Sequence, residues 1–187
     1  MLATPPFLHH EMTTMTHRIR RVTTVSGNQL RDLAELLIDC VDGGASVSFM
    51  HPLSMQKALA FWGEVADGVG RDERALLVAE DDTGIIGTVQ LVLAQPENQP
   101  HRADLAKMLV HRRARRQGLG EALLRAAEQL ARDCGKTLLV LDTVTGSDGE
   151  RLYTRVGWQK SGIIPDYALW PRGGLCATTY FYRVLGD

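Results

Sequence analysis

The chain has 187 residues, of which 44% are hydrophobic and 23% are charged, and its formal net charge at pH 7 is −1. This length and composition are ordinary for a globular domain, and they exclude a disordered or collagen-like chain. The near-zero net charge disfavours a general nucleic-acid-binding protein, which usually carries a basic surface. A small net charge can also result from regions of opposite sign that cancel, so the positions of the charges matter more than their sum.

The cysteines and the apolar runs indicate the compartment. Cys40, Cys134 and Cys176 are widely spaced and form no C-x-x-C pair, which favours reduced thiols in a cytoplasmic protein over a disulfide framework or a metal site. No apolar run approaches the roughly 18 residues of a membrane-spanning helix. We interpret residues 1–17 as a flexible leader without the regions of a signal peptide, and residues 18–187 as one domain.

Hydrophobic periodicity predicts alternating strands and helices. Apolar residues three and four apart indicate helices, and β-branched or continuous apolar runs indicate strands. The predicted elements in chain order are a strand at 18–25, helices at 30–41 and 55–69, strands at 75–80, 85–94 and 103–111, a long helix at 118–134, a strand at 137–144, a short helix at 149–156, and strands at 158–164 and 177–184. This order predicts an α/β domain with a mixed sheet of six to seven strands and about four helices.

The strand–helix–strand unit from 103 to 144 should cross over in the right-handed sense, which makes its two strands parallel. The second of these strands, TLLVLDTV, is almost continuously apolar, and this is typical of a central strand that is buried on both faces.

The most informative stretch joins this unit's first strand to its helix. It reads HRRARRQGLGE, with four arginines between 112 and 116 and with Gly118 and Gly120 at the entry to the helix. Glycines let backbone amides approach a ligand, and a helix N-terminus adds free N–H groups and partial positive charge. These features favour a phosphate or pyrophosphate group. Leu123 replaces the third glycine of a dinucleotide fingerprint and no Gly-Lys-Ser/Thr follows, so neither a Rossmann site nor a P-loop is predicted.

Two segments carry a family resemblance. LVHRRARRQGLGEALL resembles the acetyl-coenzyme A motif of the GNAT N-acetyltransferase superfamily, and GERLYTRVGW resembles its short helix with a Tyr followed by Gly and an aromatic residue. The order of elements from about Arg18 to Leu185 matches the GNAT, or acyl-CoA N-acyltransferase, fold. The segments GGASVSFM, HRADLAKMLV, LLVLDT, PDYAL, GGL and TTYFY resemble acetyltransferases of the tabtoxin-resistance type, which acetylate the amine of a small β-lactam amino acid.

The resemblance implies acetyl-CoA as the co-substrate and no metal. In the family, the pantetheine arm lies in a gap between the two parallel strands, so the backbone of Met108, Leu109 and Val110 would contact it, and one of their amides would polarise the thioester carbonyl. The pyrophosphate would be held by a set of loop and helix-start residues that comprises Arg115, Arg116, Gln117, Gly118, Leu119 and Gly120.

One position departs from the family pattern. Many members carry an Asn seven residues before the Tyr, where it bonds the pantetheine. This chain has Gly146 there and Ser147 next to it. Either that contact is missing, or Ser147 makes it.

The resemblance and the chemistry together suggest an acid and a base. An alkylammonium acceptor has a pKa of about 10, so a base must take its proton before the amine attacks. The candidates are Asp104, at the start of the first parallel strand, and Asp142, at the C-terminal end of the second; both matching positions are implicated in the tabtoxin-resistance type. Asp142 is more suggestive, since open α/β sheets bind ligands at strand C-terminal ends, although a turn or capping role is the alternative for each. Tyr153 would protonate the departing thiolate.

The sequence therefore predicts an enzyme that acetylates the primary amine of a small molecule, with an amino-acid-like antibiotic as one candidate acceptor. Protein N-terminal or lysine acetylation is the alternative within this class. A non-catalytic acyl-CoA-binding module and a nucleic-acid-binding module are the alternatives outside it. No membrane or nucleic-acid partner is expected, and a homodimer is one expectation, since family members are often dimers. Trp62 is expected in the core, with the acceptor pocket as its alternative place.

Overall fold

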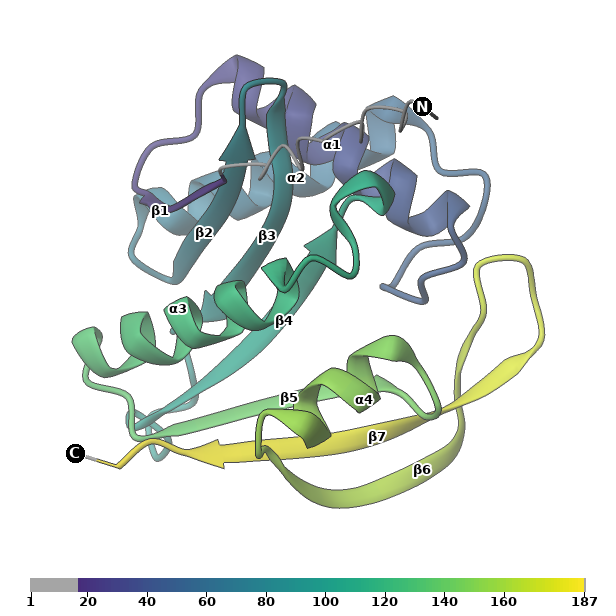
Figure 1. The fold of residues 1–187 in the computed structure, drawn as a ribbon. Coiled ribbons are helices and arrows are strands. Elements are labelled where there is room, and N and C mark those ends of the chain that lie inside the picture. Colours follow the sequence, from purple (N-terminus) through teal and green to yellow (C-terminus); the bar gives the residue numbers. More distant parts are fainter. Residues whose placement is uncertain (1–16, 187) are drawn as a thin grey trace, which may run out of the picture.

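The computed structural model describes residues 17–186, so the predicted leader lies outside the described residues except for its last position. The described part of the chain forms a seven-stranded mixed sheet with helices on both faces (Figure 1). The elements are β1 (Arg18–Val22), α1 (Gly27–Asp42), α2 (Met55–Gly70), β2 (Arg74–Asp81), β3 (Gly84–Val92), β4 (Arg102–Val110), the 3-10 helix η1 (Arg112–Ala114), α3 (Leu119–Asp133), β5 (Leu138–Val144), α4 (Asp148–Arg155), β6 (Gln159–Leu169) and β7 (Leu175–Val184). The prediction of a mixed α/β fold is confirmed.

The strands lie in the order β1-β2-β3-β4-β5-β7-β6, and the pairing of β4 with β5 is parallel, as the crossover predicts. Two apolar layers hold the helices to the sheet. One buried cluster joins α1 and α2 to β2 and β3, and another joins α3 to the opposite face of the sheet. Trp62 is 1% exposed inside the first cluster, so its place is in the core and not in the acceptor pocket. Within residues 17–186, no helix is long and apolar enough to cross a membrane.

Local chemistry explains where the first two helices begin. Ser26 caps α1 in a capping box, because its hydroxyl accepts from the Gln29 amide while the Gln29 side chain accepts from the Ser26 amide. Ser54 caps α2 through the amide of Lys57. These side chains satisfy N–H groups that the first turn of a helix leaves free.

The last hairpin differs from its prediction. β6 runs from Gln159 to Leu169, through Pro165, where a strand that ends at 164 is predicted. β6 is an edge strand, and proline is tolerated there because one side of the strand needs no ladder partner. Register shifts between Lys160 and Gly162 and between Ile164 and Ala168 also bend the strand. The resulting long hairpin reaches the loop between α1 and α2 (Figure 1).

The separation of β4 from β5 is the feature that prepares a site. These strands pair only from Arg102↔Leu138 to Asp104↔Val140, although both continue for several residues beyond that point. In Figure 1 they diverge toward the β6–β7 hairpin. The register of β4 against β3 shifts opposite Thr88 and Gln90, and Lys107 within this irregular stretch has a φ of 49°. A bulge of this kind bends a strand away from its neighbour.

Candidate active site

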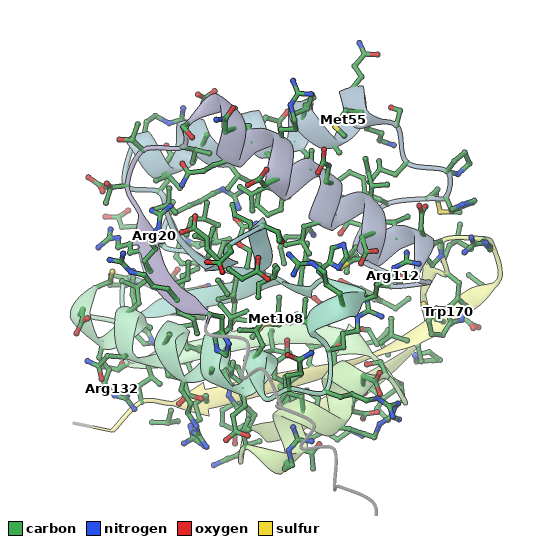
Figure 2. All side chains as sticks on the ribbon, turned by 45° about the horizontal axis from the view of Figure 1, so that its top comes forward. Arg20, Met55, Met108, Arg112, Arg132 and Trp170 are labelled. Carbon is green, nitrogen blue, oxygen red and sulfur yellow. The ribbon has the colours of Figure 1, made fainter. Side chains whose placement is uncertain are left out.

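A cavity of about 420 Å³ opens where β4 and β5 separate. Four parts of the chain line it: the loop after α1, the bulge of β4, the end of β5 with one residue of α4, and the β6–β7 hairpin. The hairpin and the loop are joined by two hydrogen bonds, from the His51 amide to the Pro171 carbonyl at 2.8 Å and from the Ser46 hydroxyl to the Leu169 carbonyl at 2.9 Å. Figure 2 shows Trp170 on this hairpin, at the edge of the molecule, and Met108 of β4 near its middle. The two hydrogen bonds between the hairpin and the loop after α1 close one wall of the cavity.

Tyr153 of α4 lines this cavity and is 5% exposed. Its ring packs on Trp158 and Phe181, with centroids 5.7 Å and 5.9 Å away. Burial, together with the nearby charge of Asp142, raises the pKa of the Tyr153 hydroxyl above its ordinary value. No residue between 17 and 186 forms a hydrogen bond with this hydroxyl. Tyr153 therefore gives the cavity a protonated hydroxyl that has no acceptor within this part of the chain.

The two candidate bases have different surroundings. Asp142 lines the cavity, and its carboxylate accepts a hydrogen bond of 2.9 Å from the Thr178 hydroxyl. Asp104 forms an ion pair with Arg102 and accepts a hydrogen bond of 3.1 Å from the Gln95 side chain, and it is not among the residues that line the cavity. The geometry therefore favours Asp142 as the group that can meet a ligand in the cavity.

The N-terminus of α3 is shaped for close approach by a ligand. Gly118 is its N-cap, with a φ of 81°, and no N-cap side chain accepts a hydrogen bond from the first amides of the helix. A side chain at this left-handed position would be strained, which explains the glycine. A Cβ at Gly120 would lie 3.2 Å from Leu152 Cδ2, so this glycine allows α3 and α4 to pack closely. Free amides at a helix start favour an anion.

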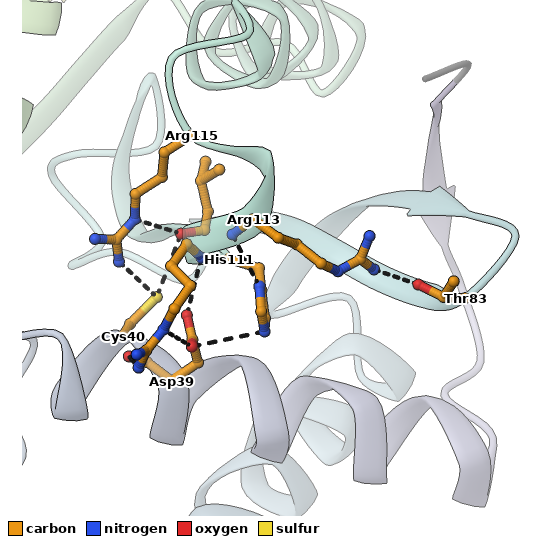
Figure 3. A network of polar contacts seen from close by, with 8 residues as sticks. Asp39, Cys40, Thr83, His111, Arg113 and Arg115 are labelled. Atoms are coloured by element: carbon orange, nitrogen blue, oxygen red, sulfur yellow. Dashed lines mark hydrogen bonds and ion pairs between the residues drawn. The ribbon is translucent and has the colours of Figure 1, made fainter. Parts of the chain in front are cut away.

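The arginines before this helix do not act as one charged group. Arg112 pairs with Asp39, and its amide donates to the same carboxylate at 3.0 Å. Arg113 pairs with Asp81. Its guanidinium also donates to the Thr83 hydroxyl, as Figure 3 shows. These two arginines fasten the loop to α1 and to the β2–β3 turn, and their carboxylate partners offset part of the positive charge that the four arginines were expected to supply for a phosphate.

Arg115 and Arg116 are the remaining pair. The Arg115 guanidinium donates to the Val110 carbonyl at 3.0 Å, and Arg116 has a φ of 61°. Each contributes to lowering the pKa of Asp148, for which the paired Arg151 is the main cause, so both positive charges lie near the start of α4. Gln117 is exposed, and its side chain donates to the Arg113 carbonyl at 3.1 Å. The structure thus leaves two arginine charges beside the α3 N-terminus.

The residues of β4 differ in whether their backbone N–H and C=O groups are free to contact a cofactor. The His111 amide donates to the Ile86 carbonyl, and Leu109 lies opposite Thr88. Because hydrogen-bonded and non-bonded pairs alternate along an antiparallel ladder, the peptide groups of Leu109 face β3 and those of Val110 face the gap. The Val110 carbonyl is occupied by Arg115, which leaves its N–H toward the gap. Met108 lines the cavity, and the side chain of Leu109 is buried in the core.

Ser147 has a local structural role. Its hydroxyl caps α4 by accepting from the Glu150 amide at 3.1 Å, and it lies 3.3 Å from the Thr143 hydroxyl. The Ser147 hydroxyl thus has a capping role in α4, and its contact with pantetheine stays a prediction.

Lys107 is a cavity residue that the sequence analysis did not select, and a lysine inside the otherwise apolar run LAKMLV was the available signal. The bulge, which no periodicity reveals, brings its side chain into the cavity.

Comparison with known proteins identifies the fold and the family. The model of the Acetyltransferase (GNAT) family matches residues 32–158. N-acetyltransferase 8B from Rattus norvegicus is 36% identical over 100 residues, which cover 52% of this chain and 45% of that protein, so the chain spans less than half of that relative. An uncharacterized N-acetyltransferase from the hisH-hisA intergenic region of Azospirillum brasilense is 32% identical over 126 residues, which cover 66% of this chain and 73% of that protein.

The structural comparison agrees. yncA from Salmonella typhimurium, whose structure was solved with its cofactor acetyl-CoA, has a TM-score of 0.74 at 20% identity and covers 92% of this chain and 95% of its own. This similarity shows the shared fold. The family resemblance seen in the loop before α3 and in the helix that carries Tyr153 is confirmed, and the match covers more than half of the chain. The chain belongs to the GNAT family of acetyltransferases.

Proposed function

We propose that this protein moves the acetyl group of acetyl-CoA to the primary amine of a small molecule. The observation that carries the proposal is one cavity, at the separation of β4 and β5, that both Tyr153 and Asp142 line. A hydroxyl donor with no hydrogen-bond partner in the described part of the chain, and a carboxylate in the same cavity, are the acid and the base that acetyl transfer to an amine needs.

The chain's residues fit acetyl-CoA. The uncapped amides at the start of α3, with Arg115 and Arg116 nearby, suit the pyrophosphate. The Val110 N–H, which faces the gap, suits an amide carbonyl of pantetheine. Acetyl-CoA would supply the activated acetyl group, and its pantetheine arm would lie between the separated strands β4 and β5.

In this proposal each residue performs one step. Asp142 accepts a proton from the ammonium group of the acceptor, which frees the nitrogen lone pair for attack on the thioester carbon. An amide of the β4 bulge, near Met108, donates a hydrogen bond to the carbonyl oxygen as its negative charge grows. Tyr153, which its raised pKa keeps protonated, donates its proton to the leaving thiolate. The attacking nitrogen still carries one excess proton after it bonds to the thioester carbon, and the transfer of that proton to the Tyr153 oxygen completes the amide and restores the hydroxyl. Asp104, already paired with Arg102, is the alternative base.

The size of the cavity supports a small acceptor. About 420 Å³ lies within the range of roughly 300–1,000 Å³ that is usual for small-molecule pockets. The contacts between the hairpin and the loop after α1 close a wall that an extended polypeptide would need open. An amino-acid-like β-lactam is the acceptor that the sequence resemblance implies, with antibiotic resistance as the corresponding role. Protein acetylation is the alternative, and a cytoplasmic location and a homodimer remain predictions.

A turnover assay tests the proposal. The purified protein is incubated with acetyl-CoA and a panel of primary amines, and released thiol and N-acetyl product are measured together. We expect amine-dependent thiol release that equals product formation. If no amine is acetylated while CoA binds by calorimetry, the chain is an acyl-CoA-binding module. If CoA does not bind, the cofactor assignment also fails.

A further inference from the structure

Lys107 is a charged residue of the cavity that the proposed acetyl transfer does not use. Its side chain is partly buried, and no carboxylate of residues 17–186 lies within ion-pair distance of it. Its ammonium group instead donates to the Ser48 hydroxyl at 3.1 Å and lies 5.5 Å from the centroid of the Phe61 ring. Holding an ammonium group away from water without an anion is unfavourable. An anionic group of a ligand would therefore be stabilised at this position.

Two residues with unusual backbone conformations meet at this position. Lys107 has a φ of 49° and Ser48 has a φ of 76°, and neither residue is glycine. The two lie 59 positions apart in sequence, on the β4 bulge and on the loop after α1, and their side chains are hydrogen-bonded to each other. Left-handed conformations of such residues are costly and concentrate at functional sites. The fold therefore fixes the ammonium group at the wall of the cavity.

The same cavity carries the opposite charge. Asp142 lines it together with Lys107. Burial lowers the pKa of Lys107 and nearby Arg74 lowers it further, whereas the charge of Asp142 raises it, so Lys107 and Asp142 are within electrostatic reach. Phe49 and Phe61, with ring centroids 5.2 Å apart, add an aromatic surface next to the lysine. A cation, an anion and an apolar wall together complement a zwitterion with a side chain.

We propose that Lys107, with the Ser48 hydroxyl as a second donor, binds the carboxylate of the acceptor, so that the acceptors are free amino acids and their analogues. In this arrangement the ammonium group of the acceptor meets Asp142 and its carboxylate meets Lys107. The inference rests on the proposed function and names the acceptor class for the same site. It disfavours polyamines and the N-termini of proteins, which have no carboxylate beside the amine.

The test compares matched acceptors. Amino acids are paired with their decarboxylated amines, such as phenylalanine with phenethylamine, methionine with 3-(methylthio)propylamine and lysine with cadaverine. The readout is the ratio of kcat/KM between the members of a pair, for wild type, Lys107→Met, Lys107→Arg and Lys57→Met. Lys57 is the matched control, because its ammonium group lies 5.8 Å from the ring of Phe49 and it does not line the cavity.

We expect wild type to prefer the amino acid of at least one pair. A hydrogen bond between charged groups corresponds to about 10- to 100-fold, so Lys107→Met should reduce that preference by about this factor, mainly through KM. Lys107→Arg should retain part of it, and Lys57→Met should leave it within about threefold. An equal loss on both members of the pair would assign Lys107 to the acetyl group or to folding, and it would overturn the inference.

A binding measurement separates failure of this inference from failure of the proposed function. Amino acids are titrated by NMR into wild type and Lys107→Met in the presence of CoA. Saturable binding that depends on Lys107, without any turnover, would support the carboxylate site and contradict the acetyl transfer. Turnover of the decarboxylated amines with no preference for amino acids would support the acetyl transfer and contradict the carboxylate site. If no amino acid binds or reacts, the carboxylate site is refuted.

Discussion

Replacing Tyr153 with Phe removes one hydroxyl and retains the ring. The ring contacts with Trp158 and Phe181 remain, and the hydroxyl has no hydrogen-bond partner among residues 17–186, so the free energy of unfolding should change by less than about 0.5 kcal/mol. A positioned general acid contributes about 10²- to 10⁴-fold to a rate. The substitution should therefore lower kcat at least about 100-fold, equal to about 2.7 kcal/mol of barrier, and leave acetyl-CoA affinity within about twofold.

The pH dependence gives a second test of Tyr153. Its pKa in the folded protein lies above the ordinary value of 10.0, so the stability gained from the protonated hydroxyl is fully present below pH 10 and is lost as the pH rises above that value. Wild type should accordingly show no alkaline fall in kcat from this residue below pH 10. Above pH 10, the free energy of unfolding of Tyr153→Phe should fall less steeply with pH than that of wild type, because the variant lacks this ionisable hydroxyl.

The assay for Tyr153→Phe combines three measurements on one preparation. Thiol release gives kcat, calorimetry gives the affinity for acetyl-CoA, and thermal unfolding reports the fold. Tyr182→Phe is the matched control, because the Tyr182 hydroxyl donates to Gln159 and does not line the cavity. A normal kcat in Tyr153→Phe, or parallel losses of kcat and acetyl-CoA affinity, would refute the general-acid role.

Other substitutions test the remaining parts of the site. Asp142→Asn should lower kcat/KM by about 100-fold near pH 7.5, and the loss should shrink as the pH approaches the amine pKa of about 10; a loss that is the same at every pH would make Asp142 a binding residue only. Gly118→Ala should destabilise the protein by about 1 kcal/mol in thermal unfolding, because the φ of 81° disfavours a Cβ that otherwise meets no atom. Gly27→Ala, at an open helical position, should not destabilise it. Arg113 is the main reason that the pKa of Asp81 lies well below its ordinary 3.8. Arg113→Gln should therefore lower the free energy of unfolding at neutral pH, and the difference from wild type should become smaller as the pH falls below about 4. Urea unfolding measures this difference, and a difference that is the same at every pH would contradict the reasoning.

Sequence reasoning succeeded where the signal is local. The loop from 112 to 120 sets its own turn and helix start through glycines at fixed positions, and the order of strands and helices follows from periodicity. The separation of β4 from β5 also agrees with what the family resemblance implies.

Side-chain partners that come from distant segments could not be predicted. Arg112 meets Asp39 across 73 positions and Arg113 meets Asp81 across 32, so two of the four charges before α3 are neutralised by contacts that only the folded chain forms. The position of Asp142 at a strand end favoured it over Asp104 in the sequence, but the Arg102 and Gln95 side chains that occupy the Asp104 carboxylate could not be predicted.

The position of Lys107 depends on a bulge in the pairing of β3 with β4. Such a register shift does not alter the hydrophobic periodicity of either strand's sequence, so it could not be predicted. The extent of β6 was missed for a related reason. Pro165 reads as the end of a strand unless the strand is known to lie at the edge of the sheet.

A crystal structure of the protein with acetyl-CoA tests the central claim most directly. We predict that the pyrophosphate lies at the amides of Gly118 to Gly120, that the pantetheine arm passes between β4 and β5, and that the thioester sulfur lies within hydrogen-bond reach of the Tyr153 hydroxyl. Acetyl-CoA bound elsewhere, or a thioester directed away from the cavity that Tyr153 and Asp142 share, would contradict the account.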